Sequence, residues 1–433
     1  MNVAGRKTRI KEFFDDLARK GGGHLSRKTA YYRYITKLVG RLIPARGRIL
    51  ELGSGPGQLL ASLEPEHGVG LDISDEMVRL SSESYPDYDF RAGDAEALSP
   101  DEQFDVVLGV NLVGVLDDVY TCFKAVRKTL PDSGRFVIVY HNQLWEPLLK
   151  LAAKLGLRSP VPNENWLPLS DLANILRLAD FDVVRTGRRM LCPVGIPVLS
   201  WFLNTIVSPL PGFQWLGLVE YVVARPAPSK FQAEDGGPSC SVIIPTRDEK
   251  GNIEDAITRT APMGRHTEYI FIDGNSSDGT VEEIHRVMKA YPDLDIKFAS
   301  QDGKGKADAV RKGFAMASED ILMILDSDLT MPPEDLPKYY EALVTGKAEF
   351  VNGCRLVYPM EDEAMRFLNK IANHAFGKIF SWLMEQTVRD TLCGTKVLRR
   401  EAYDQIAANR TFFGDFDPFG DFDLLFGAAR LNL

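Results

Sequence analysis

Residues 48–57 read RILELGSGPG, and residues 321–328 read ILMILDSD. In each stretch, an apolar run typical of a buried β-strand ends abruptly in glycines or acidic side chains. Similar runs alternate with stretches of helical spacing along both halves of the chain, which is typical of parallel sheets covered by helices. We therefore predict an α/β fold with two doubly wound domains, and sites beyond the carboxyl ends of the strands.

The predicted strands and the linker divide the chain in two. In the first half we expect strands at 48–53, 68–74, 89–94, 104–110, 135–140, 181–188 and 219–225, and in the second at 241–246, 268–274, 295–300, 321–328 and 349–354. Between them, residues 226–239 read PAPSKFQAEDGGPS, with three prolines and two glycines and no apolar period. We predict domains over 1–225 and 240–433, joined by a linker at 226–239.

Charge and cysteine usage limit the functional classes. The 433 residues carry a net charge of -9, although residues 1–47 alone carry +9. An acidic remainder argues against nucleic-acid binding. The basic segment could meet an anionic membrane or substrate, or form the solvated face of an amphipathic helix. Five scattered cysteines without a CxxC pair argue against disulfides and structural zinc, so we expect a reducing, cytoplasmic location.

A long uncharged run extends from Leu191 to Val219. It exceeds the roughly 20 residues that a membrane-spanning helix needs. Four prolines interrupt it, and proline breaks helical hydrogen bonding. We therefore expect this segment to lie in a membrane interface or to cover a core, and not to span a bilayer.

The glycine-rich turn after the first strand predicts a nucleoside site. Its Gly53, Gly55 and Gly57 allow close approach of a ligand, but Gln58 stands where the dinucleotide fingerprint requires glycine. An acid, Glu51, would also repel a pyrophosphate. Acids at successive strand ends, at Glu51, Asp72 and Asp94, suit a cationic nucleoside without phosphate, and S-adenosylmethionine is that molecule.

Four segments, ELGSGPG, VGLDISDEM, GDAEAL and FDVVLGVNLVGVL, together resemble the motifs of class I S-adenosylmethionine-dependent methyltransferases. The resemblance covers about residues 30–225 and implies a Rossmann-like, seven-stranded sheet. It places the turn from Glu51 to Gly57 near the methionine part of the cofactor and Asp72 at the ribose. It also implies that Asp94, with its neighbour Ala95, meets the adenine, and that Met77 packs beside it.

The methyl acceptor and a general base are not assigned by the sequence. Many relatives carry a histidine in the segment that here reads NLVGVL, where this chain has Val113 and Gly114. Three residues after the fifth strand, His141, Asn142 and Trp145, either line the acceptor pocket or pack as an ordinary loop.

The second half carries a DxD pair, Asp326 and Asp328, at the end of an apolar strand. Two adjacent carboxylates cannot both be buried without a counter-charge. Oxygen ligands of this kind suit Mg²⁺ or Mn²⁺, with diphosphate oxygens filling other positions. A helix cap with a neighbouring acid is the alternative for an isolated pair.

The pair occurs in a set of segments, SVIIPTRDEKGNI, IFIDGNSSDGT, DGKGKADAVRKGF and ILDSDLTMPPEDL, that resembles glycosyltransferase family 2, especially its dolichol-phosphate mannose synthase-like branch. The resemblance covers about residues 239–433 and implies a GT-A fold and an inverting transfer from a nucleotide-sugar donor. It implies donor binding by Pro245, Arg247, Glu249, Asp273, Asp278, Lys304 and Lys306, and metal binding by the catalytic acids Asp326 and Asp328. Departures from the family pattern, Asp248 for asparagine and Thr330 for glutamine, leave the third metal ligand and the sugar open.

The acceptor in that branch is a polyprenyl phosphate, so the resemblance implies a lipid-phosphate acceptor and peripheral contact with the inner face of a membrane. Residues 364–385 carry apolar side chains at near-helical spacing and either rest in a membrane interface or pack in a core. Residues 389–396 resemble the segment around the acceptor phosphate. Two further catalytic candidates, Asp421 and Asp423, fall near the family's acceptor-side acid. We expect this domain to be shortened at its C-terminus.

The sequence therefore predicts a bifunctional transferase, with S-adenosylmethionine-dependent methyl transfer in one domain and metal-dependent sugar transfer in the other. The alternative is that only one domain is catalytic and the other binds or regulates.

Overall fold

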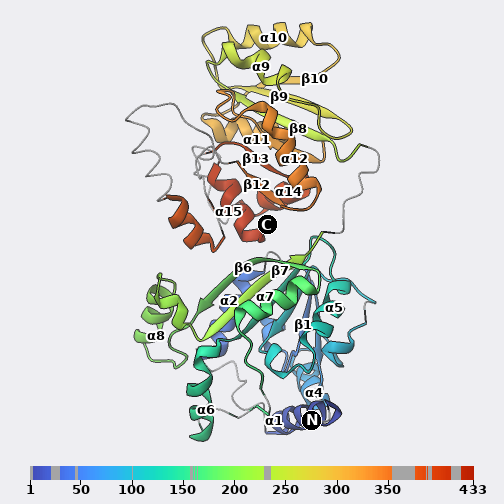
Figure 1. Ribbon diagram of the computed structural model, residues 1–433, viewed down its shortest axis with the longest axis vertical. Coiled ribbons are helices and arrows are strands. Elements are labelled where there is room, and N and C mark those ends of the chain that lie inside the picture. The colour runs from blue at the N-terminus through green and yellow to red at the C-terminus, as the bar shows by residue number, and fades with distance from the viewer. Residues whose placement is uncertain are drawn as a thin grey trace. The chain divides into compact units, whose positions relative to one another are not determined.

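A computed structural model of the protein describes residues 3–20, 30–43, 47–99, 101–156, 159, 161–162, 164–228, 236–353, 376–386, 388, 393–410 and 421–433. The chain divides into two compact units, unit 1 over residues 1–227 and unit 2 over residues 228–431. Each unit is built on one sheet, so the predicted pair of α/β domains is confirmed (Figure 1).

The sheet of unit 1 has seven strands in the order β3-β2-β1-β4-β5-β7-β6. They are β1 (Arg48–Leu52), β2 (His67–Asp72), β3 (Asp89–Ala92), β4 (Val106–Val110), β5 (Arg135–His141), β6 (Phe181–Arg189) and β7 (Val219–Pro226). Strands β1 to β5 pair in parallel, whereas β7 runs antiparallel to both β5 and β6. The alternation of apolar runs predicts parallel pairing throughout the sheet. That prediction is wrong for β7, which pairs antiparallel with both of its neighbours.

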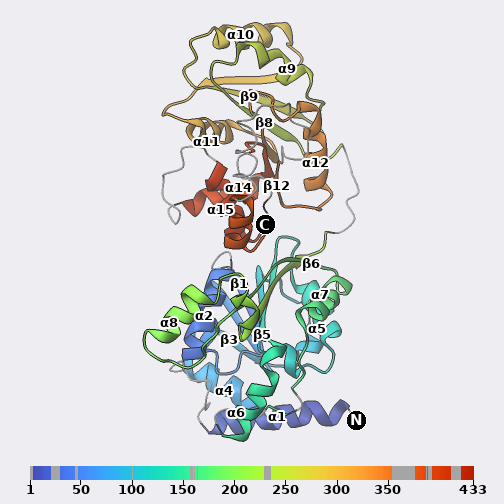
Figure 2. The ribbon, with the colours of Figure 1, turned by 60° about the vertical axis from the view of Figure 1, so that its left-hand side comes forward.

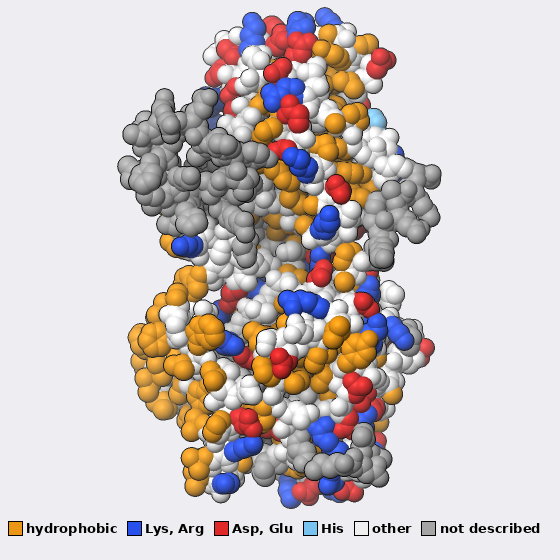
Figure 3. Space-filling view, viewed as in Figure 1, with side chains coloured by type: hydrophobic (Ala, Val, Ile, Leu, Met, Phe, Trp, Pro, Cys, Tyr) orange, Lys and Arg blue, Asp and Glu red, His pale blue; other side chains and the backbone are white. Residues whose placement is uncertain are grey.

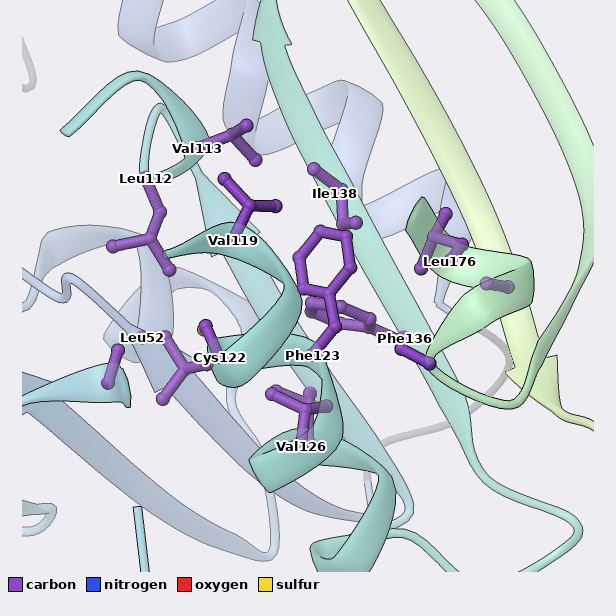
Figure 4. Close-up of a cluster of buried hydrophobic side chains, with 14 of the residues drawn as sticks. Leu52, Leu112, Val113, Val119, Cys122, Phe123, Val126, Phe136, Ile138 and Leu176 are labelled. Atoms are coloured by element: carbon purple, nitrogen blue, oxygen red, sulfur yellow. The ribbon is translucent and has the colours of Figure 1, made fainter. Parts of the chain in front are cut away.

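Helices cover the two faces of that sheet and bury two apolar clusters (Figure 2). The described helices of unit 1 are α1 (Val3–Arg19), α2 (Ala30–Leu42), α3 (Gln58–Leu63), α4 (Asp75–Ser84), α5 (Val119–Thr129), α6 (Glu146–Lys154), α7 (Leu169–Leu178) and the short α8 (Leu199–Phe202). Of these, α6 and α8 contain no buried residue. On one face, α5 presents Val119, Cys122, Phe123 and Val126 to the core, at the spacing of one helical stripe (Figure 4). The ring of Phe123 meets that of Phe136 on β5 edge to face, with centroids 5.1 Å apart.

The sheet of unit 2 has six strands in the order β10-β9-β8-β11-β13-β12. They are β8 (Cys240–Thr246), β9 (Thr267–Asp273), β10 (Asp295–Ser300), β11 (Ile321–Ile324), β12 (Phe350–Asn352) and β13 (Lys396–Arg399). The helices are α9 (Ile253–Thr258), α10 (Thr280–Ala290), α11 (Lys306–Met316), α12 (Leu336–Val344), α14 (Arg400–Ala408) and α15 (Asp421–Leu431). The sequence missed β13, a four-residue strand that runs antiparallel between β11 and β12.

Several expected segments fall partly outside the described residues. Of the apolar segment 364–385, residues 364–375 lie outside, while residues 376–384 are helical with Phe376, Ile379 and Leu383 exposed. Residues 389–392 of the expected phosphate segment and residues 412–420 before Asp421 also lie outside. Among the helices that the structure describes, none combines the length and the apolar character needed to cross a membrane.

Candidate functional sites

The first pocket lies in unit 1, beyond the carboxyl ends of β1, β2, β3 and β4. Its wall combines the glycine turn, three strand-end acids and one face of α1. The residues that line it include Lys7, Ile10, Phe14, Glu51, Gly53, Gly55, Asp72, Asp94, Ala95 and Asn111. The acids predicted to meet the cofactor therefore share one cavity.

The turn after β1 favours glycine at each of its three positions. Gly53, Gly55 and Gly57 have φ values of 69°, 50° and 73°, in the left-handed region that disfavours side chains. A Cβ on Gly57 would also lie 2.5 Å from the ring of Phe90. Gly57 precedes the first turn of α3, whereas Gly53 and Gly55 line the pocket.

Glu51 is a buried acid in this wall. Only 3% of its surface is exposed, and its Oε2 accepts a hydrogen bond from the amide of Leu60 at 3.1 Å. Burial raises the pKa of Glu51 to about 8, against the opposing effect of that amide. The pocket therefore holds a neutral carboxyl near pH 7, and a bound cation would favour its ionised form.

Asp72 ties the first turn to the second strand. Its Oδ2 accepts from the amide of Gly55 at 2.7 Å and its Oδ1 from that of Ser74 at 2.9 Å. Burial raises the pKa of Asp72, and these amides oppose the rise. Met77, predicted to pack beside the adenine, is fully buried on α4 and is not among the residues that line the pocket.

Helix α1 covers the pocket, and its Lys7 forms an ion pair with Asp94, the third acid of the wall. The ammonium of Lys7 lies 2.6 Å from Asp94 and 2.7 Å from Glu96, while Ile10 and Phe14 line the wall. The basic N-terminal segment thus contributes to a binding pocket, which its sequence did not predict. Both ribbon views place α1 beside α4 (Figure 1, Figure 2).

Ion pairs and hydrogen bonds hold α1 at both sides of the pocket. Arg6 pairs with Asp117 at 2.6 Å, beyond the end of β4. Farther along the helix, Asp15 accepts a hydrogen bond from the Ser74 hydroxyl at 2.6 Å, beyond the end of β2. Helix α1 is therefore anchored to the two loops between which the cavity lies.

A polar cluster adjoins this pocket at the ends of β4 and β5. The hydroxyl of Tyr31 lies 3.1 Å from Nε2 of His141 and 3.2 Å from Oδ1 of Asn111, which lines the pocket. On the other side of the imidazole, Nδ1 of His141 lies 3.8 Å from Glu164. Sequence spacing could not reveal this cluster, because Tyr31 and His141 are 110 residues apart.

The other acceptor-side candidates have structural contacts. The Asn142 amide donates to the carbonyl of Gly217 at 2.8 Å, and the indole of Trp145 donates to that of Leu216 at 2.8 Å. Both residues thus hold the segment before β7. Val113, in the segment where many relatives carry a histidine, is 2% exposed and belongs to the core.

The second pocket lies in unit 2, beyond the carboxyl ends of β8, β9 and β11. Its wall joins the loop after β8, the first turn of α11 and the DxD segment. It is lined by Pro245, Thr246, Arg247, Glu249, Gly274, Gln301, Gly305, Lys306, Ala309, Asp326, Ser327 and Asp328. Six of the nine expected donor and metal positions line this pocket. They lie together because parallel strands present their carboxyl ends at one edge of a sheet.

The DxD acids are suited to a divalent cation. Asp326 and Asp328 offer only oxygen atoms to the pocket, and the ammonium of Lys306 lies 2.5 Å from Asp326. A cationic group thus already meets this carboxylate in the structure. Among the described residues, no group of three or more His, Cys, Asp or Glu side chains could hold a metal alone. A hard cation would therefore need ligand phosphates or water to complete its coordination.

Three expected donor-binding residues do not line this pocket. Asp273 is 3% exposed and accepts from the amide of Asn275 at 3.0 Å, within the turn after β9. Asp278 accepts from the amides of Thr280 and Lys250 at 3.0 and 3.1 Å, and the hydroxyl of Thr280 lowers its pKa. Lys304 is exposed on the loop before α11.

The acceptor-side acids lie on α15. Asp423 is 8% exposed, and its Oδ2 lies 2.8 Å from Arg410 and 3.4 Å from Arg311. It does not line the second pocket. The side chain of Asp421 lies outside the described residues.

Comparisons with known proteins agree with these two architectures. Residues 24–186 match the family model described as a methyltransferase domain, and residues 241–407 match the model of glycosyl transferase family 2. The chain therefore contains a methyltransferase domain and a family 2 glycosyltransferase domain.

Individual relatives of the second domain are dolichol-phosphate mannosyltransferases. The protein of that name from Pyrococcus furiosus is 32% identical over 174 residues, covering 39% of this chain and 48% of the relative. Its namesake from Saccharomyces cerevisiae is 39% identical over 108 residues, covering 24% and 40%. The chain thus spans less than half the length of these relatives.

For the first domain, the magnesium protoporphyrin IX methyltransferase from Synechocystis PCC 6803, solved with bound SAH, is a distant structural neighbour. It is 16% identical with a TM-score of 0.37, over 51% of this chain and 100% of the other. A likeness this low carries no inference about substrate.

Proposed function

We propose that the protein is a bifunctional transferase that methylates one acceptor and glycosylates another in the assembly of a lipid-linked glycan. The observation that carries this proposal is the pair of strand-end pockets. One is lined by Glu51, Asp72 and Asp94, and the other by Asp326 and Asp328.

In unit 1, the acids and the glycine turn would hold S-adenosylmethionine, which supplies an electrophilic methyl group. Glu51 and the turn bind the methionine part, and Asp72 accepts hydrogen bonds from the ribose. Asp94 and Ala95 bind the adenine. Lys7, now paired with Asp94, covers this end of the site.

The Tyr31–His141 pair would bind the methyl acceptor and hold its proton. Its link through Asn111 places a titratable imidazole next to the cofactor pocket. A base in that position typically contributes a factor of about 10² to 10⁴ to a rate. Glu164, on the far side of the ring, would orient the imidazole.

In unit 2, Asp326 and Asp328 would hold Mg²⁺ or Mn²⁺, which neutralises charge on the departing nucleoside diphosphate. Pro245, Arg247 and Glu249 form the nucleotide wall, and Lys306 meets the diphosphate. Lys304 would close over the donor, and Asp273 and Asp278 shape the turns that border the site.

The acceptor of the sugar would be a polyprenyl phosphate, as the names of the dolichol-phosphate relatives suggest. A phosphate monoester has a second pKa of about 6, so its oxygen would attack without a general base. The new bond to the anomeric carbon would form on the side opposite to the departing nucleoside diphosphate, which inverts that carbon. Asp421 and Asp423 would act on this acceptor side. Such an acceptor implies a cytoplasmic protein that is peripheral at the inner face of a membrane.

Thermal shift with nucleotide sugars tests the sugar-transfer half. One donor should raise the melting temperature only with Mn²⁺, and Asp326→Asn should abolish that rise. Asp255→Asn, an exposed acid of α9, is the matched control and should retain it. No metal-dependent rise with any donor would refute this half and leave the glycosyltransferase unit as a non-binding module.

Isotope-labelled S-adenosylmethionine tests the methyl-transfer half. Labelled methyl should reach a lipid-linked glycan, and Asp72→Asn should weaken cofactor binding while the exposed control Asp89→Asn does not. Binding without transfer to any such glycan would favour the alternative, in which unit 1 regulates unit 2.

A further inference from the structure

Unit 1 exposes a large apolar surface that its two cores and its pocket do not explain. Among the described residues, 21 large hydrophobic side chains are exposed, and 15 of them lie within residues 144–155 and 194–216. Trp201 and Trp215 are 61% and 60% exposed. Figure 3 shows hydrophobic side chains gathered over the region of α8 and α6. Monomers rarely leave so much apolar area in water without a use.

The two segments form one continuous surface, which we call the apolar face and define as residues 144–155 and 194–216. The indole of Trp145, at the start of α6, donates to the carbonyl of Leu216 at 2.8 Å. Along α6, Leu148, Leu151 and Leu155 are more than half exposed at the spacing of one helical stripe. The apolar face therefore combines a helix and an irregular segment, both held by hydrogen bonds.

A basic stripe borders the apolar face. A Cβ on Gly195 would lie 3.2 Å from that of Ala30, the first residue of α2. Along α2, Arg33, Lys37 and Arg41 are exposed at intervals of four residues, and the helix contains no acid. Apolar and cationic surfaces thus meet at the N-terminus of α2.

We propose that the apolar face and the stripe of α2 form a docking surface for an anionic lipid membrane. The irregular part of the face lies in a run that is uncharged from 191 to 219, and it displays two tryptophans, the side chains that favour the membrane–water interface. The α6 part adds one acid, Glu146, and two cations, Lys150 and Lys154. The acid-free cationic stripe of α2 at one border of the face complements acidic headgroups. A protein partner or a second copy would bury the apolar face but gives no reason for an acid-free cationic border.

The position of this surface bears on the methyl acceptor, an extension that rests on the proposed function. Tyr31 follows Ala30 on α2, and its hydroxyl meets His141 beside the cofactor pocket. Trp145, which anchors the apolar face, lies four residues after His141. A membrane bound to this surface would therefore present its lipids at the acceptor side, so the methyl acceptor is a lipid-linked molecule.

Vesicle co-sedimentation of the full chain tests the docking surface. The protein should sediment with vesicles of phosphatidylcholine and phosphatidylglycerol, and less with phosphatidylcholine alone. The Arg33→Gln and Lys37→Gln changes should each weaken binding about fivefold, the effect of about 1 kcal/mol per basic residue. The Trp201→Ser change should weaken binding to both kinds of vesicle.

Matched controls keep the result specific. Leu178→Ser removes an exposed apolar side chain from α7, and Lys128→Gln removes an exposed charge from α5. Both should bind vesicles like the wild type. Equal loss in the controls, absence of vesicle binding, or a dimer in sedimentation that Trp201→Ser dissolves would each overturn the proposal.

Vesicle binding requires neither S-adenosylmethionine nor a sugar donor, so it separates this surface from the transferase activities. Binding without methyl transfer would refute the proposed function and leave the surface intact. Methyl transfer to a water-soluble glycan with no vesicle binding would refute the surface and leave the transferase intact.

Discussion

The buried acid of the first pocket should make the stability of unit 1 depend on pH in a defined direction. Glu51 is 3% exposed, and burial raises its pKa from 4.5 to about 8. Between those two pH values the folded protein keeps a proton that the unfolded chain has lost. The free energy of unfolding therefore falls as pH rises through this window, and the group is fully stabilising only below it.

The magnitude follows from the width of the window. Each pH unit is worth about 1.4 kcal/mol, so ionising this side chain costs roughly 5 kcal/mol of stability by pH 8. Glu51→Gln keeps the size of the side chain and an acceptor for the Leu60 amide but cannot ionise. We expect the difference in unfolding free energy, variant minus wild type, to grow by about 1.4 kcal/mol per pH unit between pH 5 and pH 8.

Urea unfolding followed by tryptophan fluorescence measures this difference, since four of the five tryptophans lie in unit 1. The matched control is Glu83→Gln, an exposed acid of α4, which should give a pH-independent difference. A variant curve that stays parallel to the wild type from pH 5 to pH 8 would refute the reasoning. It would mean that Glu51 is ionised in the folded protein or reached by water.

Three further outcomes follow from single contacts. Lys7→Ala leaves Asp94 without its ammonium and loosens α1, so S-adenosylmethionine should dissociate a few-fold faster in stopped-flow measurements, as expected for a partly exposed ion pair worth up to about 1 kcal/mol. Lys297→Met removes the cation beside the fully buried Glu268 and should destabilise unit 2 by about 3 kcal/mol in urea unfolding. His141→Asn should lower methyl transfer by a factor of about 10² or more while leaving cofactor affinity within twofold, measured by single-turnover transfer and by calorimetry.

Each of these changes has a control at a similar but unrelated position. Lys11→Ala breaks an exposed pair on α1, Lys289→Met removes an exposed charge on α10, and His67→Asn changes a half-buried histidine on β2. Lys11→Ala should leave the dissociation of S-adenosylmethionine unchanged, Lys289→Met the stability of unit 2, and His67→Asn the rate of methyl transfer. Unchanged dissociation in Lys7→Ala, stability loss shared by Lys289→Met, or full transfer in His141→Asn would contradict the respective argument.

The alternation of apolar and polar residues in the sequence determined where the strands lie and at which edge of each sheet the candidate sites are found. Apolar runs of strand length end at Glu51, Asp72 and Asp94, and parallel neighbours necessarily bring such ends together. The same rule brought Arg247 and Asp328 to one pocket. These inferences required only the period of the side chains and the direction of the strands.

Contacts between distant segments were decided by the tertiary structure alone. Lys7 meets Asp94 across 87 residues, and Tyr31 meets His141 across 110. The four-residue β13 owes its strand conformation to its neighbours β11 and β12. Such contacts leave no periodic trace in the sequence, because each depends on which surfaces remain exposed after the sheets have formed. For the same reason, the sequence of the uncharged run from 191 to 219 was compatible both with a segment that covers a core and with one that lies in a membrane interface. Only the exposure of its side chains in the folded unit shows that it forms a surface.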